Sequence, residues 1–218
     1  MRRLVIGVFT SALVLVAPAL AKPGQSASSV TIAASANPIA AGSSVKLTGQ
    51  ATGKKAAGAK VDLQAEPAGA TSFSTVSSTT ADTTGHYSFT AAPSVNTTYR
   101  AMTKTAPTAT SPTLLVEVRV KVTIHVSTSR PAVGHMVGFS GFVSPAYTGK
   151  TVLIQWRSAT GWRTVARVKL AAATPLGALS RSKYSVRIRF QKSGRYRARF
   201  DPANNANLPN TSPVRRLT

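Results

Sequence analysis

The chain contains no cysteine. This absence excludes disulfide bonds, thiolate metal sites, a cysteine nucleophile and a lipid-modified N-terminal cysteine. The fold must therefore be held together by core packing, which domains of about 100 residues can provide without disulfides. The 218 residues of the chain leave room for two such domains.

Acidic residues are also scarce, because the chain has five Asp and Glu against 27 Lys and Arg. The five are Asp62, Glu66, Asp82, Glu117 and Asp201. Asp62 and Glu66 are close in sequence, but we expect one on a strand and the other in the loop that follows it. A glycosidase needs two carboxylates that flank a single bond. The sequence therefore offers no obvious pair for this chemistry.

The three histidines, His86, His125 and His135, do not have the spacing of a His-x-x-x-His metal motif. The sequence also lacks a calcium loop of clustered Asp, a glycine-rich phosphate loop and a Gly-x-Ser-x-Gly nucleophile motif. We therefore predict a non-catalytic protein that uses no metal and no cofactor. A small extracellular enzyme is the alternative, and the missing chemistry counts against it.

Helix-forming residues never gather at the 3.6-residue spacing of an amphipathic helix. Short β-type runs between Pro, Gly and Asn recur instead, which predicts an all-β fold. In one run, Tyr196, Ala198 and Phe200 alternate with three arginines, as in a half-buried antiparallel strand. A slip of one residue would bury the arginines, so we expect this register to be strongly fixed.

The N-terminus has the three parts of a secretory signal peptide. After Met1-Arg2-Arg3, an apolar stretch runs to Val16, and the segment closes on Ala19-Leu20-Ala21. We predict a signal peptide over 1–21, a flexible segment over 22–28 and a secreted or envelope-associated mature chain. A transmembrane anchor is the alternative, but this run is short for a bilayer, which needs about 20 apolar residues. No later segment is long and apolar enough to span a membrane.

The chain contains an internal repeat. Val30-Thr31-Ile32 opens a pattern that returns at Val122-Thr123-Ile124, about 92 residues later. Further segments match in the same order: 60–64 with 151–155, 73–76 with 162–165, 86–89 with 183–186, 98–101 with 195–198, and 111–112 with 212–213. Because only the loop lengths differ, we infer two copies of one domain. They are the first repeat, residues 29–118, and the second repeat, residues 119–218.

Turn signals separate the expected strands. Asp82-Thr83-Thr84-Gly85 has the Asp and Gly positions of a type I turn, and Thr160-Gly161 is expected at a hairpin tip. Each repeat yields about seven short strands, the number in an immunoglobulin-like sandwich; a closed barrel is the alternative. We predict an all-β protein of two tandem immunoglobulin-like antiparallel β-sandwiches after the signal peptide, joined by a short, semi-rigid linker over 116–121.

The repeat resembles the bacterial immunoglobulin-like domains that occur in tandem in exported and cell-surface proteins. The matching features include a Pro-x-x-(x)-Gly turn before Val-x-(Leu/Phe)-x-Gly, a Val-x-Leu-Gln strand, an Asp-x-x-Gly-x-Tyr-Ser-Phe strand and a Ser-Pro pair before the terminal strand. The resemblance implies a sandwich fold, a spacer, adhesion or binding role, and no catalytic residues. The second repeat departs from the pattern, because the longer segment 171–180 replaces its Asp-x-x-Gly turn.

Positive charge is concentrated in the second repeat. Residues 22–118 have seven Lys and Arg and four acidic residues, whereas 119–218 have eighteen Lys and Arg and one acidic residue, Asp201. Such asymmetry points to an acidic partner for the basic part. Strand alternation, together with the neighbours that a sandwich would supply, brings many arginines to one face. The predicted polyanion-binding residues are Arg157, Arg163, Arg167, Arg195, Arg197, Arg199 and Arg215.

Guanidinium groups suit phosphate, so we expect a binding or adhesion module whose second repeat docks to an anionic polymer of the cell envelope or to another polyanion, such as phospholipid head groups or extracellular nucleic acid. A protein partner is one alternative, and a charge that serves only solubility or reflects codon bias is another. Sequence-specific binding of nucleic acid is not expected, because no recognition motif is present. Tyr147, Trp156 and Trp162 would suit a sugar-stacking platform, but strand alternation directs Trp156 to the core. Trp162 aligns with Phe73 of the first repeat and is expected to cover the edge of that core.

Overall fold

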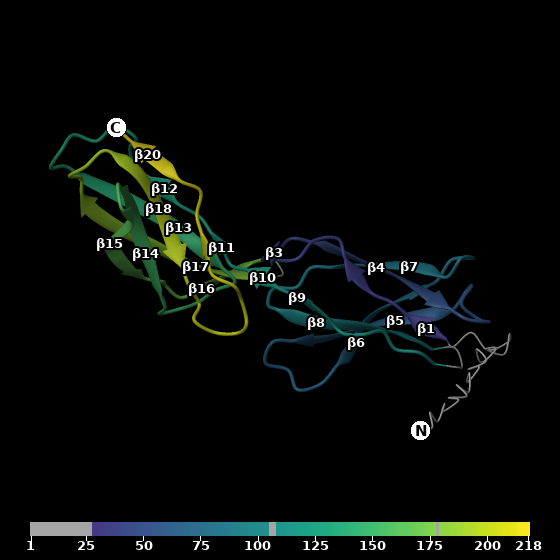
Figure 1. Ribbon diagram of the computed structural model, residues 1–218. Helices are drawn as coiled ribbons and strands as arrows, with labels where there is room; N and C mark the ends of the chain where they lie inside the picture. The colour runs from purple at the N-terminus through teal and green to yellow at the C-terminus, as the bar shows by residue number, and fades with distance from the viewer. Residues whose placement is uncertain (1–27, 105–107, 178) are drawn as a thin grey trace, which may run out of the picture.

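The structure, a computed structural model, describes residues 28–104, 108–177 and 179–218 (Figure 1). The predicted signal peptide and the predicted flexible segment up to residue 27 lie outside this part of the chain. The described residues are all-β, as the composition predicted, and form several antiparallel sheets without a helix. They therefore include no helix that would cross a membrane. The strands of the two repeats form two groups that lie end to end in Figure 1.

The first repeat has two antiparallel sheets around one hydrophobic core. In one sheet, β4 (Val45–Thr52) pairs with β1 (Ser29–Val30), β2 (Ala33–Ala34) and β7 (His86–Ala91). The other sheet consists, in spatial order, of β6 (Ser74–Thr80), β5 (Lys60–Pro67), β8 (Thr97–Thr103) and β9 (Leu114–Val116). Leu47 of the first sheet and Leu63 of the second are both fully buried in the shared core.

The second repeat has the same arrangement. In one sheet, β13 (Met136–Ser144) pairs with β11 (Lys121–Val122), β12 (His125–Val126) and β17 (Leu179–Arg189), and β17 also pairs with β16 (Ala173–Leu176). In the other sheet, β14 (Thr151–Ser158) lies between β15 (Gly161–Lys169) and β18 (Gly194–Phe200), and β18 pairs with β19 (Asn210–Thr211) and β20 (Arg215–Leu217). Phe139 and Phe200 pack in the core between the two sheets.

The segment between the repeats includes a short strand that forms hydrogen bonds with both repeats. β10 (Val118–Arg119) runs parallel to β3 (Ile39–Ala40) of the first repeat. The N–H of Leu208, from the second repeat, donates to the carbonyl oxygen of Val118 at 2.8 Å. Val116 and Val118 belong to the first core, and Val120 and Val122 belong to the second. Because every second residue of this segment is a valine buried in one core or the other, the connection is not a free linker.

A tyrosine that crosses a glycine occurs at the same place in both repeats. The Tyr184 hydroxyl donates to the carbonyl oxygen of Thr123 at 2.5 Å, and Tyr87 donates in the same way to Thr31. Each tyrosine passes directly over a glycine of the neighbouring strand, Gly141 in the second repeat. The Val-x-(Leu/Phe)-x-Gly motif therefore ends in glycine because a side chain there would occupy the path of this hydrogen bond.

The predicted turns are present. The N–H of Gly85 donates to the carbonyl oxygen of Asp82 at 3.0 Å, and the Asp82 carboxylate accepts the N–H of Thr84 at 2.8 Å. Thr160 lies at the tip of the β14–β15 hairpin. Within the longer segment 171–180 of the second repeat, the chain forms the extra hairpin of β16 and β17. The prediction for Glu66 was wrong, because Glu66 lies on β5 with Asp62 and not in a loop.

Replacing Gly141 with alanine tests the tyrosine-over-glycine contact. The added Cβ atom would lie 2.2 Å from the Thr123 carbonyl oxygen and 2.7 Å from the Tyr184 hydroxyl. We expect Gly141→Ala to lower the free energy of unfolding by about 1–3 kcal/mol through overpacking, as measured by urea denaturation. Gly138→Ala in the same strand is the control, since its nearest contact would be an ordinary 3.5 Å. Equal effects of the two substitutions would contradict this explanation.

Candidate anion-binding face of the second repeat

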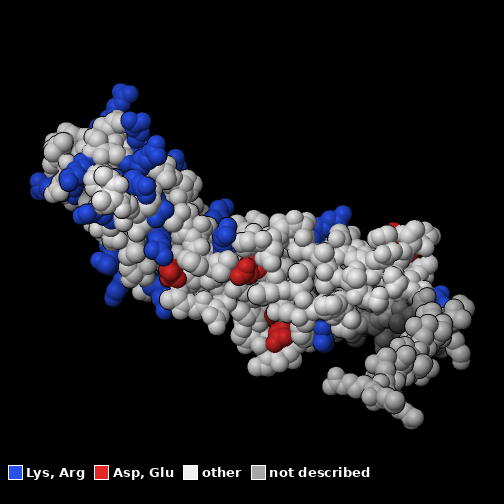
Figure 2. Space-filling model, viewed as in Figure 1, with Lys and Arg blue, Asp and Glu red and all other residues white. Residues whose placement is uncertain are grey.

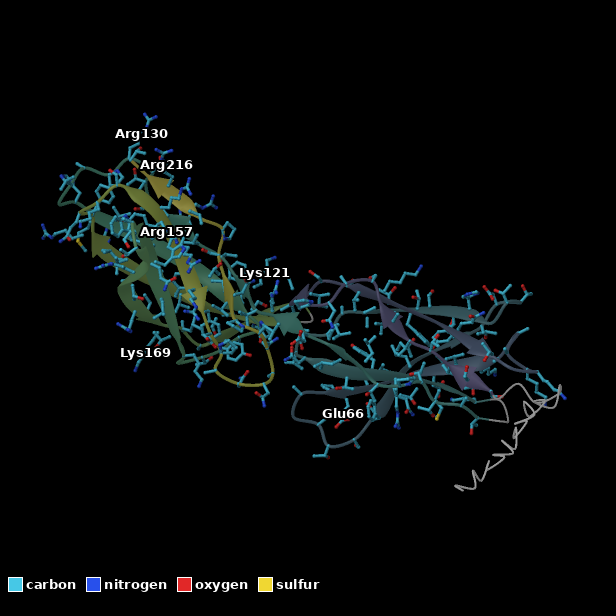
Figure 3. All side chains as sticks on the ribbon, in the orientation of Figure 1. Glu66, Lys121, Arg130, Arg157, Lys169 and Arg216 are labelled. Atoms are coloured by element: carbon cyan, nitrogen blue, oxygen red, sulfur yellow. The ribbon has the colours of Figure 1, made fainter. Side chains whose placement is uncertain are left out.

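The positive charge covers the visible side of the second repeat, whereas the first repeat is mostly uncharged (Figure 2). The described residues contain two ion pairs, Lys104 with Asp62 and Arg199 with Asp201. Most Lys and Arg side chains of the described chain are therefore not neutralised by a carboxylate. Figure 3 shows the side chains on the ribbon and labels Arg157 and Lys169 on the second repeat.

β18 forms the centre of the candidate face. Tyr196, Ala198 and Phe200 are buried in the core, so the three alternating arginines of this strand point away from it. Arg197 lies opposite Gln155 of β14, and Arg199 lies opposite Leu153. The register thus confirms the strand alternation predicted for β18.

Arg197 is held in place by two contacts. Its Nε donates to the Gln155 Oε1 at 3.0 Å, and its guanidinium carbon lies 4.0 Å from the centre of the Trp162 ring. Arg157 approaches the same ring at 5.7 Å. Burial, reinforced by the positive charges of Arg199 and Arg157, lowers the pKa of Arg197 below its usual value. The side chains are thus close enough for like charges to repel one another.

Arg199 has a weak partner. Its guanidinium lies 3.5 Å from the Asp201 carboxylate, and the two side chains are 44% and 50% exposed. Exposed pairs of this kind contribute about 0–1 kcal/mol and are screened by salt. Asp201 therefore leaves Arg199 available to an anionic ligand.

The terminal strand presents a different arginine from the one predicted. Arg216 lies opposite Arg195 and shares its outward side, whereas Arg215 lies opposite the buried Tyr196. The Nε of Arg215 donates to the carbonyl oxygen of Ile124 at 3.4 Å, at the edge of the sandwich. The expected placement of Arg215 on this face was wrong because buried Leu217 sets the side to which each residue of β20 points. The apolar character of Leu217 was the signal in the sequence that would have identified Arg216.

Arg163 does not lie on the predicted face either. It lies opposite Trp156, whose side chain packs against the core, whereas Arg167 lies opposite Leu153 on the outer side. Residues four apart in a strand normally share a side. A β-bulge in the pairing of β14 with β15 breaks this rule between Arg163 and Arg167. Arg167 therefore belongs to the face and Arg163 does not.

We define the arginine face as the outer surface of β15, β14, β18 and β20 with these arginines. They are Arg157, Arg167, Arg195, Arg197, Arg199 and Arg216, around Trp162. Five of the seven predicted residues belong to it. The opposite sheet also presents cations on its outer side, namely Lys183, Arg187 and Arg189 of β17.

The three aromatic residues considered for sugar stacking do not lie together. The Tyr147 hydroxyl donates to the Oδ1 of Asn207, and Trp156 packs against the core while its Nε1 donates to the carbonyl oxygen of Ser193. Trp162 lies on the outer side of the sheet beneath Arg197. The expectation that Trp162 covers the edge of the core was therefore wrong, and the three rings form no shared platform.

The first repeat has the same central contacts without the surrounding arginines. Arg100 donates to Gln64 at 2.7 Å and lies 4.1 Å over the ring of Phe73, as Arg197 does with Gln155 and Trp162. The neighbouring positions differ. The cross-strand register shows which residues of the first repeat occupy the positions of the arginines. In place of Arg157, Arg167, Arg195, Arg199 and Arg216, the first repeat has, in the same order, Glu66, Ser78, Thr98, Met102 and Leu115.

The first repeat also has a buried carboxylate on this face. Asp62 is 2% exposed, accepts the Ser78 hydroxyl at 2.6 Å and pairs with Lys104 at 3.0 Å. Burial alone would raise the pKa of Asp62, but the hydrogen bond from Ser78 and the contact with Lys104 outweigh it and leave the pKa below its ordinary value. Leu153 occupies the corresponding position in the second repeat.

No protein-family model matches the chain, and no curated protein sequence is significantly similar to it.

The lowered pKa of Asp62 predicts a contribution to acid sensitivity. A depressed carboxyl pKa stabilises the fold above the unfolded-state value of about 4, and this contribution is lost as the pH falls through the folded-state pKa. We expect Asp62→Asn to lower the free energy of unfolding at pH 7 and to flatten its decline in acid, as measured by urea denaturation across pH. Asp201→Asn, which removes only an exposed ion pair, should have a smaller effect at pH 7. An unchanged pH profile for Asp62→Asn would contradict the assignment.

Proposed function

We propose that this protein is an exported, non-catalytic binding module of two tandem immunoglobulin-like sandwiches. Its second repeat docks through the arginine face onto an anionic polymer of the cell envelope. The all-β fold, with two sheets around a separate core in each repeat, supports the sandwich assignment. The pattern of residues 1–21 supports export.

The comparison between the repeats is the observation that carries the proposal. Both repeats have the same pairing of the two central strands and the same arginine–glutamine–aromatic contact at the centre of this sheet. The first repeat forms them with Glu66, Thr98 and Met102 where the second has arginines. The fold therefore does not require these arginines. Because like charges on neighbouring strands destabilise a sheet, we attribute them to a ligand.

The arginine face suits an extended polyanion. Arginines two residues apart in a strand are about 7 Å apart, and those on neighbouring strands are about 5 Å apart. Guanidinium groups donate paired hydrogen bonds to phosphate or carboxylate oxygens. A flat array of this kind contacts several charges of one chain without reading a sequence. Binding should therefore release counterions and weaken as salt increases.

One observation favours a protein partner as a second candidate. β6 is an edge strand of the first repeat, it carries no charged side chain, and most of its residues are exposed. The equivalent edge strand of the second repeat, β15, has Arg163, Arg167 and Lys169. Charged residues normally protect an exposed edge from pairing. β6 lacks this protection and could accept a strand from another protein.

Retention on an immobilised phosphate polymer tests the first proposal. We expect the triple variant Arg195→Ser, Arg199→Ser and Arg216→Ser to bind at least about tenfold more weakly. The slope of log K against log salt should become shallower by about 2–3, since each phosphate contact contributes about 0.7–0.9. Arg197 is kept, because its contacts with Gln155 and Trp162 are structural.

The matched control removes the same charge from the opposite sheet. It is the triple variant Lys183→Ser, Arg187→Ser and Arg189→Ser of β17. This variant should retain most of the affinity if one face binds the polymer. Equal losses in both variants would show that total charge matters and would contradict a localised face. If retention on the polymer changes neither with salt nor in either variant, polyanion binding is refuted.

A further inference from the structure

The end of the second repeat that lies farthest from the first repeat carries exposed apolar side chains among cations. Val133 is 74% exposed in the turn between β12 and β13, and Met136 is 51% exposed at the start of β13. Figure 3 labels Arg130 and Arg216 at this end of the molecule. We call the turn of residues 127–135, Met136 and the adjoining loop 190–193 the distal tip.

The turn of the distal tip is held firmly. The N–H of His135 donates to the carbonyl oxygen of Ala132 at 3.1 Å, and the N–H of Gly134 donates to that of Phe190 at 2.8 Å. The Arg189 guanidinium donates to the carbonyl oxygen of Gly134 at 3.2 Å. Gly134 has a φ of +86°, which glycine adopts readily. Val133 therefore projects from a fixed turn.

The equivalent turn of the first repeat is a contact surface. The N–H of Ser43 donates to the carbonyl oxygen of Ala40, as the N–H of His135 does to that of Ala132. Gly42, like Gly134, has a positive φ, of +81°. Ala41, which corresponds to Val133, is only 4% exposed. Its N–H donates to the carbonyl oxygen of Arg119 in β10, so β10 covers this turn.

The distal tip is not suited to the same kind of contact. In the first repeat, the N–H of Ile39 donates to the carbonyl oxygen of Glu117. Pro131 occupies the corresponding position in the second repeat and has no N–H to donate. A strand arranged like β10 could not make this bond with the distal tip. The side chain of Val133 is thus left 74% exposed, whereas Ala41 is covered.

The cations around the distal tip indicate what kind of surface it suits. They are Arg130, Arg189, Lys192 and Arg216. None of the five acidic residues lies there, because four belong to the first repeat and Asp201 follows the opposite end of β18. Figure 2 likewise shows blue and no red on the visible side of this end. Projecting apolar groups within a cationic collar match the interface of an anionic bilayer, which offers hydrocarbon beneath its phosphates.

We infer that the distal tip inserts Val133 and Met136 into an anionic lipid bilayer while the surrounding cations bind headgroup phosphates. A soluble polymer would satisfy the cations but would leave the two apolar side chains in water. The inference therefore concerns a lipid surface in particular. It rests on the distal tip and not on the arginine face, with which it shares Arg216 alone.

Vesicles of phosphatidylcholine with and without phosphatidylglycerol test the inference. The double variant Val133→Ser and Met136→Ser should bind the anionic vesicles about tenfold more weakly, because the lost apolar area no longer leaves water. Its retention on the phosphate polymer should not change, since no charge is altered. Val76→Ser with Leu115→Ser is the control, because both side chains are exposed on the first repeat. Vesicle binding that is equal for both double variants would overturn the inference.

A probe at the turn gives an independent readout. Because the chain has no cysteine, Val133→Cys supplies a single site for an environment-sensitive dye. Its emission should shift to the blue with anionic vesicles, and a dye at Val76→Cys should not respond. If the protein binds the vesicles but the dye at position 133 keeps the emission that it has in water, the inference is overturned. Loss of polymer binding with intact vesicle insertion would instead count only against the arginine face.

Discussion

The register of β18 is the constraint on which the arrangement of charge in the second repeat depends. Tyr196, Ala198 and Phe200 fill the core, so the intervening arginines must face solvent. A slip of one residue would bury three guanidinium groups, which is prohibitive without partners. The same core packing that stabilises the repeat therefore holds the arginines in a row. The proposed ligand would meet cations whose backbone positions are fixed before it binds.

Comparison of the two repeats distinguishes the contacts that the fold requires from the surface charges that only one repeat has. Both keep the tyrosine that crosses a glycine and the arginine between a glutamine and an aromatic ring. Both also keep a buried serine, Ser111 or Ser212, whose hydroxyl accepts a backbone N–H of the neighbouring strand. These shared contacts maintain the sheets. The charges differ between the repeats, and the proposed function depends on that difference.

Much of the fold could be predicted from the sequence, because strand alternation and repeat order are local patterns. The alternation in β18, the turn at Asp82 and the hairpin tip at Thr160 were confirmed. The expected placement of Arg215 and Arg163 on the arginine face was wrong for reasons that alternation alone does not reveal. The first depends on which residue of a short terminal strand is buried, and the second on a β-bulge that changes the direction of the side chains.

The junction was the least predictable part, because its contacts join residues far apart in sequence. The Asn207 side chain donates to the carbonyl oxygens of Ser94 and Val118. The Asn96 side chain in turn accepts the N–H of Val118 and donates to the carbonyl oxygen of Asn205. No periodic pattern marks such residues. The sequence thus predicted a short connection but not the side chains that hold it.

Transfer of the arginines to the first repeat tests most directly whether they form a binding face. The substitutions Glu66→Arg, Thr98→Arg and Met102→Arg would be made in a chain whose Arg195, Arg199 and Arg216 are replaced by Ser. Retention of this chain on a phosphate polymer would then be measured against salt. Our account predicts that salt-dependent binding returns, because the receiving positions have the same register around Arg100. A folded chain that carries the new arginines and still fails to bind would contradict it.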